Sequence, residues 1–369
     1  MITLVFAKTG RTEAVFQLLF INLASGSRAD GSLFPSLRKY CPVEPTFLAH
    51  SIMRRTLLIL LFSVNCCYGQ TVKSFWNEGV QLFYEEKGKG PALYILTGGP
   101  GAPPEHPSYE IMDSLKSFYT CVLLHQRGSG KSRNIPINEQ TINIKSYLQD
   151  IDLLRRKRGD KKIALLGISW GGLLAMNYAT EYPQNISNLV LLGSAPPCFK
   201  LWNVLFDNQY VRRSSAELDS MNLLHKIFSH TTDAVLDSLK RVDPLAKEVV
   251  AFKNYMAIHV RAMHYDRSTA LKNFDELFSG FNFQPIPYID KEVLETKWDI
   301  TIALKKLTIP ALILYGRQDD QGESTFFLQK ECLKNSEMKV IERCGHIMWE
   351  DQPVAFYKIL ISYLTKNLK

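Results

Sequence analysis

Residues 163–176, IALLGISWGGLLAM, decide the fold of this chain. The apolar run that ends before Gly167 is typical of a buried strand, and the residues after Gly171 have a helical pattern. Between them lies the sequence G-x-S-x-G, with Ser169 at its centre. A strand–turn–helix with this sequence holds its serine in a strained turn and exposes the hydroxyl at the helix N-terminus. We therefore predict that Ser169 is a nucleophile; the alternative is a serine that only caps a helix.

Outward from this segment, short aliphatic runs alternate with helical patterns. Continuous apolar strands separated by helices predict a mostly parallel sheet that is covered on both faces. The predicted strands are 80–85, 92–96, 121–126, 162–168, 189–193, 311–315 and 338–342, and the predicted helices are 141–157, 171–181, 324–334 and 353–366. Residues 198–299 break this alternation, with aromatic and charged residues at helical spacing. We expect them to form a helical cap on a sheet domain made of residues 70–197 and 300–369.

A serine nucleophile needs a base, because its hydroxyl is weakly nucleophilic at neutral pH. His346 stands on the loop between the last predicted strand and the last predicted helix, and Asp319 follows the strand before it. The carboxyl ends of parallel strands meet at one edge of a sheet. We therefore assign His346 as general base and then acid, and Asp319 as the group that orients its ring. Asp320 competes with Asp319 for that role, while a surface histidine and a turn-forming aspartate are the alternatives.

A glycine-proline loop, Thr97-Gly98-Gly99-Pro100-Gly101, follows another predicted strand. Glycines allow backbone N–H groups to approach a substrate oxygen without obstruction by side chains. We expect the amide of Gly99, or that of Gly98, to form an oxyanion hole with the amide of Trp170. Loss of one such donor typically raises a barrier by about 3–4 kcal/mol. A plain turn is the alternative.

Together these motifs resemble the branch of the α/β hydrolases that contains the proline iminopeptidases. The resemblance rests on GGPG at 98–101, QRGSGKS at 126–132, GISWGG at 167–172, GRQD at 316–319 and GH at 345–346. It covers about residues 76–366. It implies an α/β-hydrolase fold with a helical cap, and a serine peptidase or amidase that removes an N-terminal residue, typically proline, without a metal or other cofactor.

Three positions depart from that family. Thr97 replaces a histidine before the glycine-proline loop, and His125 replaces an aspartate before Gln-Arg-Gly. The cap of the family often carries Trp-x-x-Trp-Glu, whose carboxylate helps to hold the substrate's amino group, whereas the nearest segment here, 252–256, ends in Met256. Without an anionic anchor, selection of an N-terminal ammonium loses its electrostatic basis.

The residues before the sheet domain resemble a targeting segment. Met53-Arg54-Arg55 precedes an apolar run that is shorter than the ~18 residues of a membrane span, as in a secretory signal. We predict a signal peptide over 53–69, cut before Gln70, and export to a periplasmic or extracellular location without a stable membrane span. Lipoprotein processing at Cys66 is disfavoured by the residues before it. We expect residues 1–52 to be a non-native or disordered extension, with translation starting at Met53.

The composition excludes several other classes of protein. The 369 residues are 46% hydrophobic and 22% charged, as in a globular protein. The net charge of +8 divides into seven Lys/Arg against three Asp/Glu in residues 1–69, and 37 against 33 afterwards. That balance does not predict a nucleic-acid partner. The cysteine spacing predicts no metal site, and the sequence carries no signal for an oligomeric state.

We therefore expect a secreted serine hydrolase that acts on a small molecule or short peptide. A carboxylesterase with the same residues is the second interpretation, and a catalytically silent binding protein of the same fold is the third. A dehalogenase or epoxide hydrolase is disfavoured, because those enzymes use a carboxylate nucleophile where this chain has Ser169.

Overall fold

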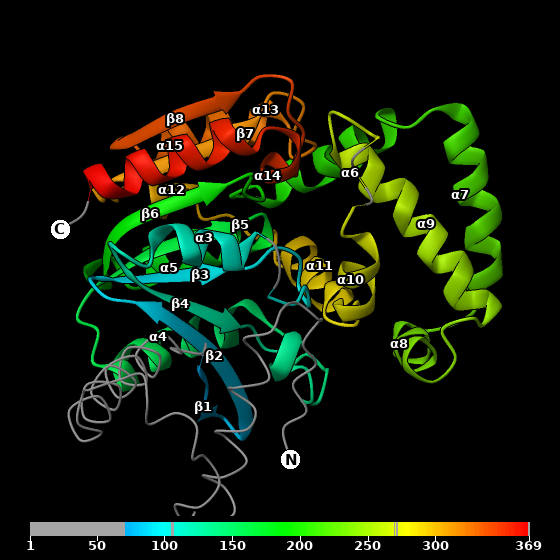
Figure 1. Cartoon of the computed structure of the whole chain (residues 1–369), viewed down its shortest axis with the longest axis horizontal. Coiled ribbons are helices and arrows are strands. Elements are labelled where there is room, and N and C mark those ends of the chain that lie inside the picture. Colours follow the sequence, from blue (N-terminus) through cyan, green and yellow to red (C-terminus); the bar gives the residue numbers. More distant parts are fainter. Residues whose placement is uncertain (1–70, 105–106, 269, 271, 368–369) are drawn as a thin grey trace, which may run out of the picture. The chain divides into compact units, whose positions relative to one another are not determined.

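The computed structural model describes residues 71–104, 107–268, 270 and 272–367. Within them, the strands form one eight-stranded sheet in the order β1-β2-β4-β3-β5-β6-β7-β8 (Figure 1). β2 pairs antiparallel with β1 and β4, and every other pair is parallel. The strands are β1 Thr71–Asn77, β2 Val80–Gly88, β3 Ala92–Leu96, β4 Thr120–His125, β5 Ile163–Ile168, β6 Ile186–Leu192, β7 Ala311–Gly316 and β8 Ser336–Ile341. The predicted α/β fold with a mostly parallel sheet is confirmed.

The central strands are apolar along their whole length because both faces of the sheet are covered. β3, β5 and β7 are buried at every position. β1 differs, since Phe75 is the one buried side chain of residues 72–77. The hairpin to β2 turns through Glu78 and Gly79, both with positive φ, as a type I′ turn requires. Sequence reasoning missed this strand because an exposed edge strand has no apolar run.

Two layers of helices cover the sheet. α3 Ser108–Leu115, α14 Met348–Asp351 and α15 Pro353–Lys366 pack on one face. α4 Ile144–Arg158, α5 Trp170–Glu181, α12 Thr301–Leu304 and α13 Glu323–Cys332 pack on the other. Short 3₁₀ turns lie at Gly130–Ser132, Pro183–Asn185 and Phe199–Leu201. α3, α12 and α14 were not predicted, because four to eight residues are too few to show a helical period.

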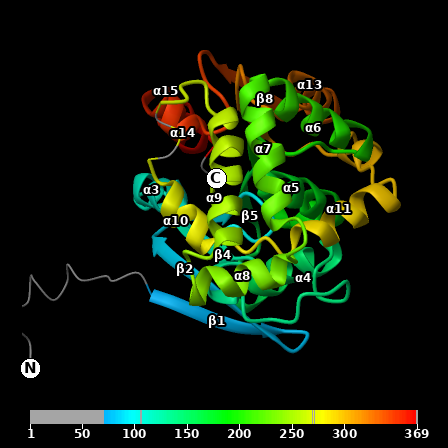
Figure 2. The same cartoon turned by 90° about the vertical axis from the view of Figure 1, so that its right-hand side faces the viewer.

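A run of helices is inserted between β6 and β7 and lies beyond the ends of the strands (Figures 1 and 2). They are α6 Trp202–Val211, α7 Ser215–Phe228, α8 Asp233–Val242, α9 Lys247–Met263, α10 Phe274–Gly280 and α11 Ile286–Glu295. Aromatic side chains of these helices, with Phe283 of the link between α10 and α11, form a separate apolar cluster that includes Phe228, Phe252 and Phe278. An antiparallel bridge between Cys198 and Asp299 joins the two connections to the sheet. We call α6–α11 the cap helices.

The predicted signal peptide over 53–69 and the extension before it lie outside the described residues. Among the helices that are described, none has the length and apolar character needed to cross a membrane. Cys121, Cys198, Cys332 and Cys344 are buried free thiols.

Candidate active site

Ser169 lies in the turn from β5 into α5, in a conformation that few side chains adopt. Its φ is 52° and its ψ is −115°. The turn brings the chain so close to β3 that a Cβ on Gly171 would lie 2.3 Å from the carbonyl oxygen of Leu96. The amide of Ser169 donates to Leu192 at 2.9 Å, and its carbonyl accepts from Ala195 at 3.1 Å. Hydrogen bonds to β6 and to the residues after it thus hold the strained residue in place. Ser169 lies at the N-terminus of α5, where negative charge is favoured.

His346 and Asp319 meet at the same edge of the sheet. The distance from His346 Nδ1 to Asp319 Oδ1 is 2.8 Å, a hydrogen bond, and both side chains are buried. Gly193, at the end of β6, makes room for the pair, since a Cβ there would lie 2.8 Å from Asp319 Oδ2 and 3.1 Å from His346 Nδ1. The backbone amide of His346 donates to Met263 of α9 at 2.7 Å, so the cap also positions this loop.

Asp320 is also buried beside the imidazole, but its Oδ1 lies 3.6 Å from His346 Nδ1 and has no hydrogen-bond partner. Its Oδ2 accepts instead from Gln209 of α6 at 3.0 Å. Of the two adjacent acids, Asp319 is therefore the one that hydrogen-bonds the ring. The nearest ligand atoms of Asp319, Asp320 and His346 lie close enough to hold a metal ion, and they form the one such group in the described part of the chain. The hydrogen bond between Asp319 and His346 requires no ion.

The charges around His346 change its titration. Burial by itself lowers the pKa of the ring, but the charge and hydrogen bond of Asp319 outweigh burial and raise the pKa to about 9. Burial raises the pKa of Asp320, although the nearby imidazole opposes that shift. The ring is therefore stabilised in its charged form chiefly by Asp319.

The glycine-proline loop lies next to Ser169. A Cβ on Gly98 would lie 3.4 Å from the Cβ of Ser169, and Gly98, Gly99 and Ser169 line one cavity. The indole of Trp170, the first residue of α5, donates to Gln126 at 3.0 Å. The side-chain amide of Gln126 then donates to the backbone and hydroxyl oxygens of Thr97, each at 3.0 Å. Sequence reasoning used the Gln-Arg-Gly segment only for family resemblance and missed that Gln126 joins the two segments expected to supply amide donors.

His125, which replaces an aspartate of the family, makes hydrogen-bond contacts that hold its loop in place. Its Nε2 lies 3.0 Å from Glu85 on the adjacent strand, and its Nδ1 accepts from the amide of Lys131 at 3.1 Å. Next to it, the buried guanidinium of Arg127 donates two hydrogen bonds of 2.7 Å to Asp150 of α4. The residues on both sides of Gln126 are thus held by buried polar contacts.

Ser169 and His346 share a cavity of about 730 Å³ with the cap helices. Most of its wall is aromatic or aliphatic. The aromatic side chains in the wall are those of Trp202, Phe206, Tyr210, Phe252, Tyr255, Phe274, Phe278, Phe281, Phe283 and Trp349. Met256, at the position where the family often has a glutamate, also lines it. The cavity is large enough for a small organic substrate and favours an apolar one.

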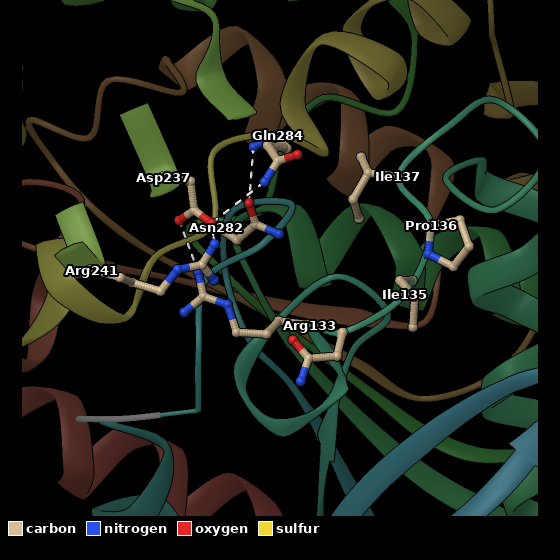
Figure 3. Close-up of a pocket in the computed structure, with 9 residues that line it drawn as sticks. Arg133, Ile135, Pro136, Ile137, Asp237, Arg241, Asn282 and Gln284 are labelled. Atoms are coloured by element: carbon tan, nitrogen blue, oxygen red, sulfur yellow. Dashed lines mark hydrogen bonds and ion pairs between the residues drawn. The ribbon is translucent and has the colours of Figure 1, made fainter. Parts of the chain in front are cut away.

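A second cavity, of about 460 Å³, is polar and contains none of the predicted site residues (Figure 3). Its centre is the buried carboxylate of Asp237 on α8. Arg133 donates to this carboxylate at 2.8 Å, Arg241 lies 3.2 Å from it, and Gln284 donates at 3.4 Å. These contacts join the loop after β4 to the cap, which is a structural role.

Comparison with known proteins agrees with this fold. The α/β-hydrolase fold family matches residues 91–353, so the chain belongs to that family and is a hydrolase by class. Within the family it is similar to proline iminopeptidases, as the sequence motifs predicted. The enzyme of Saccharolobus solfataricus is 27% identical over 285 residues, which cover 74% of this chain and 86% of that enzyme.

Other hydrolases are nearly as similar. The 2-hydroxy-6-oxononadienedioate/2-hydroxy-6-oxononatrienedioate hydrolase of Comamonas testosteroni is 26% identical over 293 residues, covering 78% of this chain and 92% of that enzyme. The crystal structure of VinJ superposes with a TM-score of 0.62 at 19% identity, over 81% of this chain and 99% of that one. This structural likeness supports the fold alone.

Proposed function

We propose that the protein is a serine hydrolase that cleaves a small amide or ester through an acyl-enzyme. One observation carries the proposal. The buried hydrogen bond between His346 and Asp319 lies at the cavity whose wall includes Ser169, which stands in a strained turn. Nucleophile, base and orienting acid are the three groups that this chemistry needs.

In the proposed reaction, the Ser169 oxygen attacks the substrate carbonyl while Nε2 of His346 takes the hydroxyl proton. Asp319, on Nδ1, orients the ring and stabilises the imidazolium. The tetrahedral intermediate collapses, and the proton passes from His346 to the leaving amine or alcohol. Water then attacks the acyl-enzyme, again through His346, and releases the acid and free Ser169.

Negative charge on the carbonyl oxygen would be stabilised by the amides of Trp170 and of Gly99 or Gly98. The proximity of Gly98 to Ser169 and the bridge of Gln126 between Thr97 and Trp170 support this assignment. Donors that are held in place before the reaction need no reorganisation when the charge develops.

For the bond that is cleaved, similarity to proline iminopeptidases supports an amide with an N-terminal residue. An ester is the second candidate, because the apolar Met256 lines the cavity where the family often has an acid. We also propose that the protein is exported, on the basis of the signal-like residues 53–69. N-terminal sequencing of the native protein tests this, since an intact segment 53–69 on the mature chain would contradict it.

The serine mechanism is tested by labelling with a fluorophosphonate and by mutation. We expect modification of Ser169 in the wild type, and none in Ser169→Ala, which should lose turnover at an unchanged melting temperature. A folded wild-type protein that does not react would favour the silent binding protein. Proline naphthylamide and p-nitrophenyl acetate then distinguish the two substrates, because turnover of the ester alone would reject the peptidase.

A further inference from the structure

Arg213, in the short link between α6 and α7, lines the same cavity as Ser169 but has no acidic partner. One of its terminal nitrogens donates to the carbonyl of Gln209 and the other lies 2.7 Å from His259 Nδ1. Its Nε is buried and has no partner. No carboxylate of the described residues lies in ion-pair contact with it; Glu217, the acid closest in sequence, pairs with Arg267 instead.

Two other arginines, the buried Arg127 and the partly buried Arg133, have the carboxylate partner that Arg213 lacks. Arg127 is neutralised by two hydrogen bonds to Asp150, and Arg133 by one to Asp237. Arg213 is partly buried, with its Nε fully so. Burial of a charge without a counter-ion is costly, and a guanidinium cannot escape that cost by losing its proton. The missing anion is therefore expected to come from a molecule that enters the cavity.

His259, on α9, provides a second donor at the same place. Burial, together with the charges of Arg213 and His346, lowers its pKa to about 4, so the ring is neutral at physiological pH. Because Nδ1 accepts from Arg213, the ring proton lies on Nε2, which has no partner among the described residues. His259 also lines the cavity.

Among the described residues, no acid in the cavity wall lies in ion-pair contact with Arg213, and Asp320 and Glu217 favour its charge only from a greater distance. Glu350 lies 3.1 Å from His264, and Asp290 accepts from the indole of Trp202 at 3.3 Å. Burial raises the pKa of both Asp233 and Asp290, which favours their uncharged forms. A buried acid can thus become neutral without a counter-ion, whereas Arg213 remains a cation.

We infer that Arg213 and His259 form a subsite for a carboxylate of the substrate, and that the substrate class is an apolar acyl compound with a free carboxylate. This inference rests on the proposed function and specifies its substrate. One guanidinium and one neutral imidazole supply a single positive charge and a few donors, which suits a monoanionic carboxylate rather than a phosphate. The aromatic wall of the cavity would bind the apolar part of the same molecule.

Kinetics with two matched esters test the subsite. The esters are mono-p-nitrophenyl glutarate, which carries a carboxylate, and its neutral methyl ester. We expect the ratio of kcat/KM for the charged ester to that for the neutral ester to fall about ten- to hundredfold in Arg213→Gln, mainly through KM. Arg261→Gln, which removes an exposed arginine of α9 outside the cavity, should leave the ratio as in the wild type. Equal losses for both esters in Arg213→Gln, or no loss for either, would overturn the subsite.

Binding measured in a variant that cannot turn over substrate distinguishes the carboxylate subsite from the proposed hydrolase activity. Calorimetry with monomethyl glutarate on Ser169→Ala should show binding that weakens about tenfold or more when Arg213→Gln is added, and less with Arg213→Lys, which keeps the charge. Binding that depends on Arg213, together with a wild type that hydrolyses neither ester, would leave the subsite standing and reject the hydrolase. Hydrolysis of both esters by the wild type, together with binding that does not depend on Arg213, would reject the subsite and leave the hydrolase standing. Melting temperatures show that each variant is folded.

Discussion

The indole of Trp170 donates a hydrogen bond to the side chain of Gln126 at 3.0 Å, and this contact joins the start of α5 to the loop after β4. The other end of the Gln126 amide donates to Thr97, directly before Gly98 and Gly99. One buried side chain therefore sets the spacing between the two segments that we propose to hold the oxyanion.

Replacement of Gln126 by Leu should lower kcat about ten- to hundredfold with a smaller change in KM. The substitution keeps a similar volume but leaves the Trp170 N–H unsatisfied, which also costs about 1–3 kcal/mol of folding free energy. Steady-state kinetics with a neutral ester and urea unfolding measure the two effects. A stability loss of that size with kcat unchanged would mean that Gln126 supports the fold alone.

Substitutions of the adjacent acids Asp319 and Asp320 should differ sharply in their effects on kcat. Asp319→Asn should reduce kcat by about four orders of magnitude, because Asn favours the wrong tautomer of His346. Asp320→Asn should reduce it less than about tenfold, since Oδ1 of Asp320 is 3.6 Å from the ring and burial already favours its uncharged form. Rates of ester hydrolysis by the two purified variants provide the comparison. Similar losses would make Asp320 the orienting acid.

The pH dependence of kcat/KM should follow the protonation state of His346. Its pKa is raised to about 9, and only the neutral ring can accept the serine proton. For a neutral ester, kcat/KM of the free enzyme should therefore rise with pH until the pH exceeds about 9. In Asp319→Asn the midpoint of this rise should move to lower pH, because the largest contribution that opposes burial is removed and only the smaller effect of Asp320 remains. A midpoint near 6.5 in the wild type would show that the charge of Asp319 is not felt by the ring.

The pair between Arg127 and Asp150 should matter chiefly for stability. Arg127→Met leaves a buried carboxylate without its partner and should cost about 3–5 kcal/mol of unfolding free energy. Arg156→Met removes an exposed arginine that pairs with Asp152 on the same helix, and should cost less than about 1 kcal/mol. Denaturant unfolding of both variants at one pH measures the difference, and equal costs would contradict the buried pairing.

Local sequence determined much of this protein. Apolar runs identified the central strands, and a strand–turn–helix around Ser169 predicted its strained turn, because burial and backbone geometry act over a few neighbouring residues. The same reasoning missed the exposed strand β1, in which only Phe75 of residues 72–77 is buried, and the helix α3, whose eight residues are too few to show a helical period. The order Ser169, Asp319, His346 was readable because the carboxyl ends of parallel strands meet at one edge.

Only the tertiary structure decided which side chains touch. Sequence reasoning assigned Asp319 but left Asp320 as a competitor, because a local pattern does not show in which direction each of two adjacent side chains points. It gave no sign that Gln126 bridges two loops, nor that Arg213 and His259, 46 residues apart, share the cavity with Ser169. Such contacts depend on how distant segments are placed by packing of the whole domain, and hydrogen bonds depend on tenths of an ångström that no local pattern encodes.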